Sequence, residues 1–196
     1  MDPDVDGILL AAGRSSRAGS FKMEVLLAGK PMLLWSLEAM AAVCPRVIVV
    51  AGFAPEKIRR LVQGRPEAEL VVNEDFASGM LTSIQAGVRL VRARRFFLMP
   101  GDMPLVKAAT YRKLLATNVG IAVPLYRGRR GHPALLDGGL IGALLAEPPG
   151  SSLGRFIERQ GFAAVAVDDP GILSDLDDPE SVKRIDAALR GGGKNE

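Results

Sequence analysis

The chain has 196 residues, a length typical of one domain, and 48% of them are hydrophobic, which is enough for a substantial core. The net charge is only +3, the basic residues are scattered and aromatic residues make up 5%, so we expect a small anionic substrate and no nucleic-acid partner. The apolar runs are far shorter than a membrane span, and the acidic start MDPDVDG lacks the pattern of a signal peptide, so we expect a cytoplasmic protein without a membrane partner.

The order of elements along residues 1–126 predicts an α/β fold. Apolar runs alternate with helical patterns, and the runs show no polar alternation, which is typical of a parallel sheet covered by helices on both faces. We therefore expect a three-layer α/β/α, Rossmann-like fold with a mostly parallel sheet. Strands are predicted at 6–12, 46–52, 68–73, 95–102 and 119–126, and helices at 30–43, 55–63, 79–93 and 108–117.

The pattern changes after Tyr126, where the sequence becomes basic and rich in glycine. We predict a short strand at 133–136, helices at 139–147 and 152–161, a strand at 162–169 and a last helix at 179–189. Asp178 is the expected N-cap of that helix, because Pro179 suits its first turn. We expect one domain, 1–190, made of a nucleotide-binding core (1–126), a smaller acceptor-binding lobe (127–175) and a closing helix (176–190), followed by a flexible tail (191–196).

Ligands of such folds bind at the carboxyl ends of the strands, so the stretch ILLAAGRSSRAGSFK after the first strand is the first candidate. It is not a dinucleotide fingerprint, which needs G-x-G-x-x-G, nor a P-loop, in which the lysine directly follows the last glycine. Backbone N–H groups around Gly13, together with the charges of Arg17 and Lys22, predict an anion-binding site. The alternative is a polar turn with solvated arginines.

Two acidic segments are candidates for metal binding. Asp102 follows the strand at 95–102 within LMPGDMP, where a carboxylate suits Mg²⁺, although helix N-caps and turns also place aspartates at such junctions. Paired with the first loop, the metal interpretation is favoured. In ILSDLDDPES, Asp175 and Asp177 point the same way in an extended segment, and one of them would complete a Mg²⁺–triphosphate site; the alternative is that these are solvated loop acids.

At these motifs the sequence resembles a known family. LAAGRSSRAGSFK is similar to the L-A-[AG]-G-x-x-x-R-x-G-x-x-K signature of nucleotidyltransferases, and GKP, NEDFASGMLTSIQAG, PGDMP, RRGHPALL and LSDLDDPE follow in the order of one branch. That branch is the molybdenum cofactor cytidylyltransferases, within the broader molybdenum cofactor guanylyltransferase-like family. The resemblance covers nearly the whole chain and implies the nucleotidyltransferase version of the Rossmann-like fold.

The resemblance also implies roles for individual residues. It assigns backbone contacts with the base and ribose to Leu10, Ala11, Ala12 and Gly13, further base and ribose contacts to Asn73, Gly79 and Ser83, and triphosphate binding to Arg17 and Lys22. Asp102 would be the Mg²⁺ ligand and Asp177 the second one. Alanine at position 12 is associated with CTP, and glycine with GTP, because a methyl group there narrows the pocket.

The segment RRGHP is expected to contact the acceptor. His132, the only histidine, would form hydrogen bonds with a pterin or phosphate, or else be a turn residue with a satisfied ring. Arg129 and Arg130 would receive the terminal phosphate of molybdopterin, unless they are solvated. Two positions depart from the family pattern: Ala18 replaces a methionine, and Glu24 replaces an apolar residue, where it would pair with Lys22 or face solvent.

The resemblance implies transfer of CMP from CTP (or GMP from GTP) to molybdopterin, with Mg²⁺ as cofactor, release of pyrophosphate and a molybdenum hydroxylase as the recipient of the product. One alternative is the same chemistry on a sugar or polyol phosphate. Another is a carrier of the molybdenum cofactor with little turnover, which only Glu24 favours. A nicotinamide dehydrogenase is disfavoured because the glycine fingerprint is missing.

Overall fold

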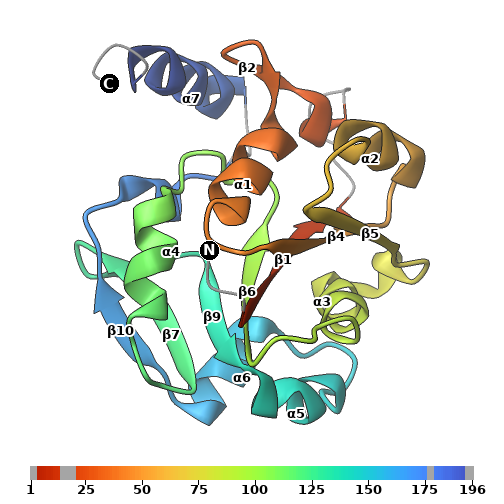
Figure 1. The fold of residues 1–196 in the computed structure, drawn as a ribbon, viewed down its shortest axis with the longest axis vertical. Coiled ribbons are helices and arrows are strands. Elements are labelled where there is room, and N and C mark those ends of the chain that lie inside the picture. The colour runs from red at the N-terminus through yellow and green to blue at the C-terminus, as the bar shows by residue number, and fades with distance from the viewer. Residues whose placement is uncertain (1–3, 14–20, 176–178, 193–196) are drawn as a thin grey trace.

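The computed structural model describes residues 4–13, 21–175 and 179–192. A central sheet is covered by helices on both faces, which confirms the predicted three-layer α/β/α fold (Figure 1). The strand order is β10-β7-β9-β6-β1-β4-β5, with β8 beside β7. Strand β1 lies between β6 and β4 and is parallel to both, and β5 is parallel to β4. Strand β9 runs antiparallel between β6 and β7. The sheet is therefore mostly parallel, as predicted.

The strands of the sheet are β1 (Val5–Ala11), β4 (Arg46–Ala51), β5 (Ala68–Val72), β6 (Arg95–Pro100), β7 (Ile121–Tyr126), β8 (Arg129–Arg130), β9 (Ala134–Asp137) and β10 (Ala163–Ala166). The α-helices are α1 (Met32–Ala41), α2 (Pro55–Val62), α3 (Met80–Val88), α4 (Ala108–Leu115), α5 (Ile141–Leu145), α6 (Leu153–Gln160) and α7 (Pro179–Gly192). Short 3₁₀ helices span Lys22–Glu24, Phe76–Ser78, Gly138–Leu140 and Pro170–Leu173.

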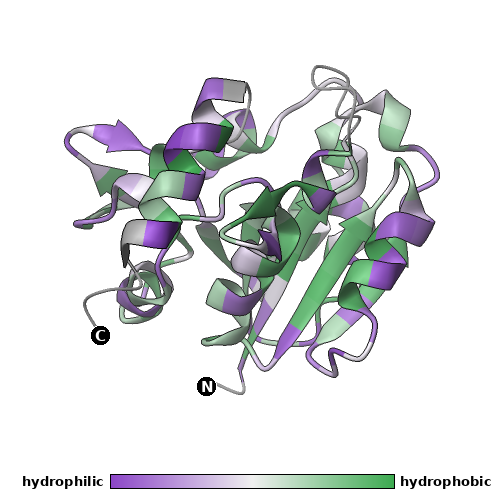
Figure 2. Cartoon of the chain, turned by 90° about the horizontal axis from the view of Figure 1, so that it is seen from above, coloured by the Kyte–Doolittle hydropathy of each residue, from purple (hydrophilic) through white to green (hydrophobic). Residues whose placement is uncertain are grey.

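Two hydrophobic clusters cover the two faces of the sheet, because successive strand residues point to opposite faces. Along β1, Val5, Leu9 and Ala11 pack against α1, α2, α4 and α7, whereas Ile8 and Leu10 pack against α3, α5 and α6. The central strands are largely apolar and the helices have polar outer faces (Figure 2). Nearly continuous burial of β1, β4 and β6 explains why these strands show no regular polar alternation in the sequence.

The predicted helix at 30–43 begins later than expected. Lys30 and Pro31 form β3, which pairs with β2 (Leu26–Leu27) in a small antiparallel hairpin, and α1 starts at Met32. The turn of the hairpin has positive φ angles at Ala28 and Gly29, which matches a tight β-hairpin connection. Pro31 therefore precedes the helix, in an extended conformation, and is not part of its first turn.

The predicted helix at 79–93 ends early for an identifiable reason. The carboxylate of Asp6 accepts hydrogen bonds from the backbone N–H groups of Arg92 and Ala93, and the Arg46 guanidinium donates to the carbonyl of Leu90. Arg46 also pairs with Asp6, with an N–O distance of 3.0 Å. Asp6 and Arg46 therefore form hydrogen bonds with backbone groups that a longer α3 would have paired within the helix, so the helix ends after Val88.

Residues 127–175 do not form a sheet of their own. They contribute β8, β9 and β10 to the central sheet, although the division into a core and an acceptor lobe stays a prediction. Helix α7 extends to Gly192, two residues beyond the predicted closing helix, while the rest of the predicted tail and the expected N-cap Asp178 lie outside the described residues. Within the described ranges, no helix combines the length and apolarity that crossing a bilayer requires.

We expect Gly87→Leu to lower the free energy of unfolding by about 1–3 kcal/mol, because α3 packs directly on side chains of the sheet there. A Cβ atom at position 87 would lie 2.7 Å from Ile8 Cγ2 and 3.0 Å from Val50 Cγ2. The matched control is Gly142→Leu on α5, where a Cβ atom would have nothing within 4 Å. Urea unfolding of both variants measures the effect, and equal stabilities would contradict close packing at Gly87.

Candidate functional site

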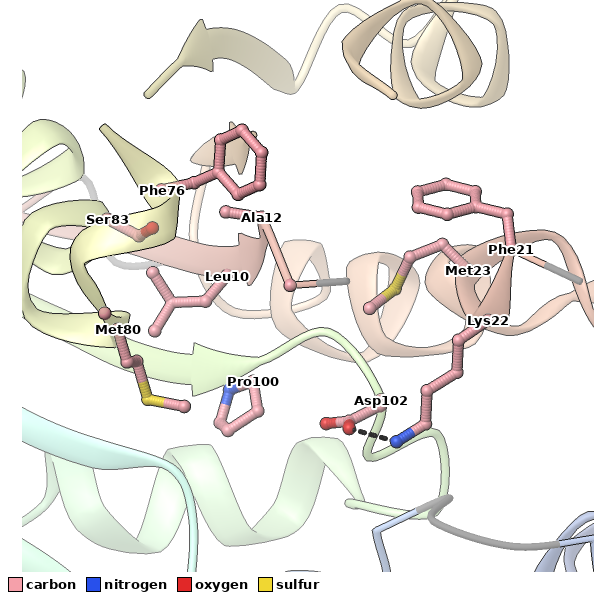
Figure 3. Close-up of a pocket in the computed structure, with 12 residues that line it drawn as sticks. Leu10, Ala12, Phe21, Lys22, Met23, Phe76, Met80, Ser83, Pro100 and Asp102 are labelled. Carbon is pink, nitrogen blue, oxygen red and sulfur yellow. Dashed lines mark hydrogen bonds and ion pairs between the residues drawn. The ribbon is translucent and has the colours of Figure 1, made fainter. Parts of the chain in front are cut away.

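A cavity of about 310 Å³ opens at the carboxyl ends of β1 and β6, where fold geometry places ligands. Leu10 and Pro100 are partners in the parallel register of these strands, so the loops that follow them are neighbours. Helix α3 and the 3₁₀ helix before it supply the opposite wall (Figure 3). The lining residues are Leu10, Ala12, Gly13, Phe21, Lys22, Met23, Phe76, Gly79, Met80, Ser83, Pro100 and Asp102.

Lys22 and Asp102 meet at one side of this cavity. The Nζ atom of Lys22 donates to Oδ2 of Asp102 over 2.7 Å, across 80 positions of the sequence (Figure 3). Both side chains are about one fifth exposed, so the charges are partly shielded from water but open to the cavity. The residues predicted to bind the triphosphate and Mg²⁺ are therefore brought together: Lys22 is a cation suited to phosphate, and Asp102 is a carboxylate suited to a divalent cation.

The predicted nucleotide-binding residues divide into two groups. Leu10, Ala12, Gly13, Gly79 and Ser83 line the cavity, as the resemblance implied. Ala11 does not line it, because its side chain is fully buried in the core on the other face of β1.

Asn73 is also absent from the cavity wall. Its Nδ2 atom donates to Thr82 Oγ1 and Ser83 Oγ, both over 2.9 Å, and its Oδ1 atom accepts from the N–H of Asp75. The side chain is buried and its hydrogen-bonding groups are occupied within the protein. Asn73 thus joins the end of β5 to α3 and positions Ser83, which does line the cavity.

Glu24, the residue that departs from the family pattern, neither pairs with Lys22 nor simply faces solvent. Its Oε2 atom lies 2.7 Å from Nζ of Lys57 on α2, and Lys57 in turn lies 5.5 Å from the centre of the Phe21 ring. An exposed pair of this kind contributes little to stability. It does hold the segment after the first loop against α2, and it leaves the Lys22 ammonium directed at Asp102.

A second cavity, of about 1250 Å³, adjoins the first. Met80, Pro100 and Asp102 line both cavities, so Asp102 lies at their junction. Part of the larger cavity is apolar, with Met103, Val123, Leu153, Ile157, Ile172 and Leu173 among its lining residues. The polar part comes from Arg129, Arg130, His132, Ser152, Arg155, Glu158, Arg159 and Asp175, so the predicted acceptor residues are brought together here.

The arginines of the larger cavity differ in how far they are neutralised. Arg130 pairs with Glu158 and lies over the Phe162 ring, and Arg159 pairs with Glu147. Arg129 and Arg155 form no ion pair with any residue in the described ranges. An anion entering this cavity would therefore meet two guanidinium groups without a carboxylate on them.

His132 lies beside this junction with a largely buried ring. Its backbone N–H donates to the carbonyl of Ile172, and its Nδ1 atom has no hydrogen-bond partner among the described residues. Burial lowers the pKa of His132 below its ordinary value, while the negative charge of Asp102 raises it by a smaller amount. The ring is therefore neutral at physiological pH, and its Nδ1 atom is buried without a hydrogen-bond partner among the described residues.

The residues around Asp102 fit a divalent cation held partly by a substrate. No group of three or more potential ligands from His, Cys, Asp and Glu occurs among the described residues, so this part of the protein offers no complete cage. Mg²⁺ often binds through one or two carboxylates together with phosphate oxygens and waters, so the partly exposed Asp102 carboxylate at the cavity junction could serve as its protein ligand. Two further predicted site residues, Arg17 and Asp177, lie outside the described residues.

Sequence reasoning missed several lining residues of both cavities. Phe21, Met23, Phe76 and Met80 were passed over because lone apolar residues near a glycine loop are indistinguishable from core residues. For Arg155 and Arg159 the sequence does contain a signal, which is the serine before the helical pattern. Ser152 is the N-cap of α6 and accepts a hydrogen bond from the Arg155 N–H, so it fixes the start of the helix that carries both arginines to the cavity.

This arrangement of strand ends, glycine loop, lysine and aspartate agrees with a known domain. The sequence model for the MobA-like NTP transferase domain matches residues 7–165. The chain belongs to the MobA-like NTP transferase family. The resemblance inferred from the motifs is thereby confirmed, and the two cavities are those of a MobA-like domain.

Curated relatives of this MobA-like protein have different activities. It is 29% identical over 177 residues to the molybdenum cofactor cytidylyltransferase of Escherichia coli strain K12, a match that covers 90% of this chain and 92% of the relative. It is 28% identical over 198 residues to nicotine blue oxidoreductase of Paenarthrobacter nicotinovorans, covering 93% and 97%.

Solved structures share the fold over nearly the full length. A nucleotidyl transferase from Methanothermobacter thermautotroptrophicus superposes with a TM-score of 0.83 at 21% identity, covering 95% of this chain and 98% of that one. A Mycobacterium tuberculosis H37Rv protein, solved in complex with manganese, gives a TM-score of 0.78 at 25% identity and coverages of 94% and 99%.

We expect His132 to titrate below its ordinary pKa of about 6.5, because burial disfavours the charged ring. The unfolded chain then takes up a proton at a higher pH than the folded one. The contribution of His132 to stability is therefore complete above about pH 6.5 and is lost as the pH falls through the lower, folded pKa.

An NMR titration of the single histidine measures this pKa directly. The pH dependence of the unfolding free energy, compared between the wild type and His132→Gln, isolates the contribution of the ring from that of the carboxylates. A ring that titrates above about 6.5 would contradict the assignment.

Proposed function

We propose that this MobA-like protein is a nucleotidyltransferase that transfers CMP from CTP to a molybdopterin-type acceptor and releases pyrophosphate. The observation that carries the proposal is the Lys22–Asp102 pair at the junction of two cavities. A nucleotide in the smaller cavity and an acceptor in the larger one would bring their reacting groups together at Asp102. The 29% identical cytidylyltransferase of Escherichia coli supports this choice of reaction.

The proposed reaction depends on the positioning of the two substrates more than on acid–base catalysis. An oxygen of the acceptor phosphate forms a bond to the α-phosphorus of CTP, and the bond from that phosphorus to the bridging oxygen of the β-phosphate breaks. Pyrophosphate leaves with the electron pair. The acceptor phosphate is already an anion at neutral pH, so no strong general base is required, in agreement with the single, neutral histidine of the chain.

Each charged group at the junction has a role in this proposal. The Lys22 ammonium would contact the triphosphate and offset charge on the leaving pyrophosphate. The Asp102 carboxylate would hold Mg²⁺ together with phosphate oxygens. When bound, the ion neutralises phosphate charge and orients the triphosphate. The manganese complex of the Mycobacterium tuberculosis relative supports a divalent cation in this family.

The larger cavity suits an acceptor that is partly flat and apolar and partly anionic. Ile157, Ile172 and Met103 would contact a heterocycle, and the unneutralised guanidinium groups of Arg129 and Arg155 would bind an anionic group. Molybdopterin has both features. Delivery of the product to a molybdenum hydroxylase in the cytoplasm belongs to the same proposal.

The alternatives make different predictions for the acceptor. Transfer to a sugar or polyol phosphate would use the same junction with another compound in the larger cavity, so an acceptor screen with CTP and Mg²⁺ separates the two. Pyrophosphate release that depends on molybdopterin supports the proposal; release with a sugar phosphate alone contradicts it. The hypothesis of a carrier with little turnover was favoured only by Glu24, and this residue pairs with Lys57 and leaves Lys22 unaffected.

We expect Asp102→Ala to lower the rate of pyrophosphate release about a hundredfold or more, because one group that stabilises the transferring phosphate is removed. Its matched control is Asp168→Ala, which changes an exposed aspartate outside both cavities. Release is measured with CTP, Mg²⁺ and molybdopterin, and thermal unfolding checks that both variants are folded. Full activity of a folded Asp102→Ala protein would exclude the proposed role.

We expect Arg129→Gln to raise the KM for the acceptor about tenfold, since a charge-assisted hydrogen bond contributes roughly 1.5–3 kcal/mol. Arg130→Gln should raise it less, because Glu158 already neutralises Arg130. Steady-state kinetics at saturating CTP provides both values. A larger effect at Arg130 would contradict the division into paired and unpaired arginines.

A further inference from the structure

The smaller cavity has a charged side and an apolar side. Lys22 and Asp102 form the charged side, and Figure 3 shows the Phe76 ring beside Ala12, away from that pair. If a triphosphate contacts Lys22, as proposed above, the nucleobase at the other end of the same molecule lies toward Phe76 and Ala12. An aromatic face and a methyl group are the surfaces on which a base stacks.

Gly52 allows Phe76 to take this position. A Cβ atom on Gly52 would lie 2.5 Å from Phe76 Cβ, 2.7 Å from Phe76 Cγ and 2.9 Å from Ala12 Cβ. Phe76 and Ala12 therefore close directly over the Gly52 backbone, and no side chain fits between them. The N–H of Phe53 also donates to the Ala12 carbonyl over 3.1 Å, which ties the loop after β4 to the end of β1.

The turn that carries Phe76 is fixed by its own hydrogen bonds. Asn73 Oδ1 accepts from the N–H of Asp75, Asn73 Nδ2 donates to Thr82 Oγ1, and that hydroxyl oxygen lies 2.9 Å from the Asp75 carbonyl. These contacts join the residues directly before the 3₁₀ helix Phe76–Ser78 to α3. The ring therefore forms a wall of fixed position, and such a wall can discriminate between bases of different size.

We propose that Phe76 is a specificity-determining residue that, with Ala12, forms the nucleobase wall and favours a pyrimidine over a purine nucleotide. The inference rests on the proposed function, because it needs a nucleoside triphosphate in the smaller cavity. The methyl group of Ala12 narrows one side of the base site, and the Phe76 ring narrows the adjacent side. Of these two residues, only Phe76 has an aromatic face on which a single-ring base can stack.

The test is equilibrium binding of CTP and GTP in the presence of Mg²⁺ and without acceptor, measured by calorimetry. Phe76→Ala should weaken CTP binding about tenfold, the usual cost of losing one stacking ring. It should also shift the ratio of CTP to GTP affinity toward GTP by about tenfold or more. The matched control is Phe53→Ala. The Phe53 ring is half-exposed, its centre lies 6.4 Å from the centre of the Phe76 ring, and it does not line the cavity, so this variant should leave the affinity ratio unchanged.

Gly52→Ala provides a second test that keeps the aromatic ring but displaces it. This variant should also shift the CTP-to-GTP ratio, and the shifts of Gly52→Ala and Phe76→Ala should combine non-additively in the double variant, because the two residues are in direct contact. Additive shifts, or an unchanged ratio in a folded Phe76→Ala protein that binds both nucleotides, would overturn the inference and leave the proposed function standing. A wild-type protein that binds neither nucleotide would overturn both.

Discussion

The parallel register of β1 and β6 is the constraint on which the site depends. Leu10 and Pro100 are paired in that register, and the N–H of Gly101 donates to the Leu10 carbonyl over 2.8 Å, which extends the pairing into the loop. Ser36 on α1 donates to the Gly101 carbonyl over 3.0 Å and fixes the same loop from the helix layer. Asp102, the next residue, is thereby held at the mouth of both cavities, within reach of Lys22.

The two hydrophobic faces of the sheet have different consequences for function. The cluster under α1, α2, α4 and α7 holds the 3₁₀ helix that carries Lys22, and its Phe21 and Met23 side chains line the smaller cavity. The cluster under α3, α5 and α6 ends at the cavities, because Met80 and Ile157 belong to helices of that layer and also line a cavity. The same helices that bury one face of the sheet therefore supply the wall opposite the strand ends.

Polar side chains near the cavities fall into those that build the site and those left for a ligand. Asn73, Glu24 and Lys57 are occupied by protein partners and hold loops in place. Arg129, Arg155 and Nδ1 of His132 have no such partner within the described ranges, although they line or adjoin the larger cavity. Nδ1 of His132 is a buried polar group that costs free energy while it has no partner, and the two exposed guanidinium groups are open to an anion, so both features are informative about the chemistry of a ligand.

Most of the fold could be predicted from the sequence, since its cause is local. Continuous apolar strands such as 46–52 are typical of a covered, parallel sheet, and the motif residues Ala12 and Asp102 lie just after strand ends. The end of α3 was not predictable in this way, because it depends on Asp6 and Arg46, more than 40 positions earlier in the chain.

The sequence by itself therefore determined the family, the layered fold and the type of chemistry, because these follow from residue type and short-range spacing. Only the tertiary structure decided which candidate residues share a surface. In the folded chain Lys22 pairs with Asp102, Asn73 lies away from the cavity and Glu24 pairs with Lys57. The tertiary structure also revealed Phe76 as a cavity wall, since an aromatic residue in a loop has no signature until the glycine on which it packs is known.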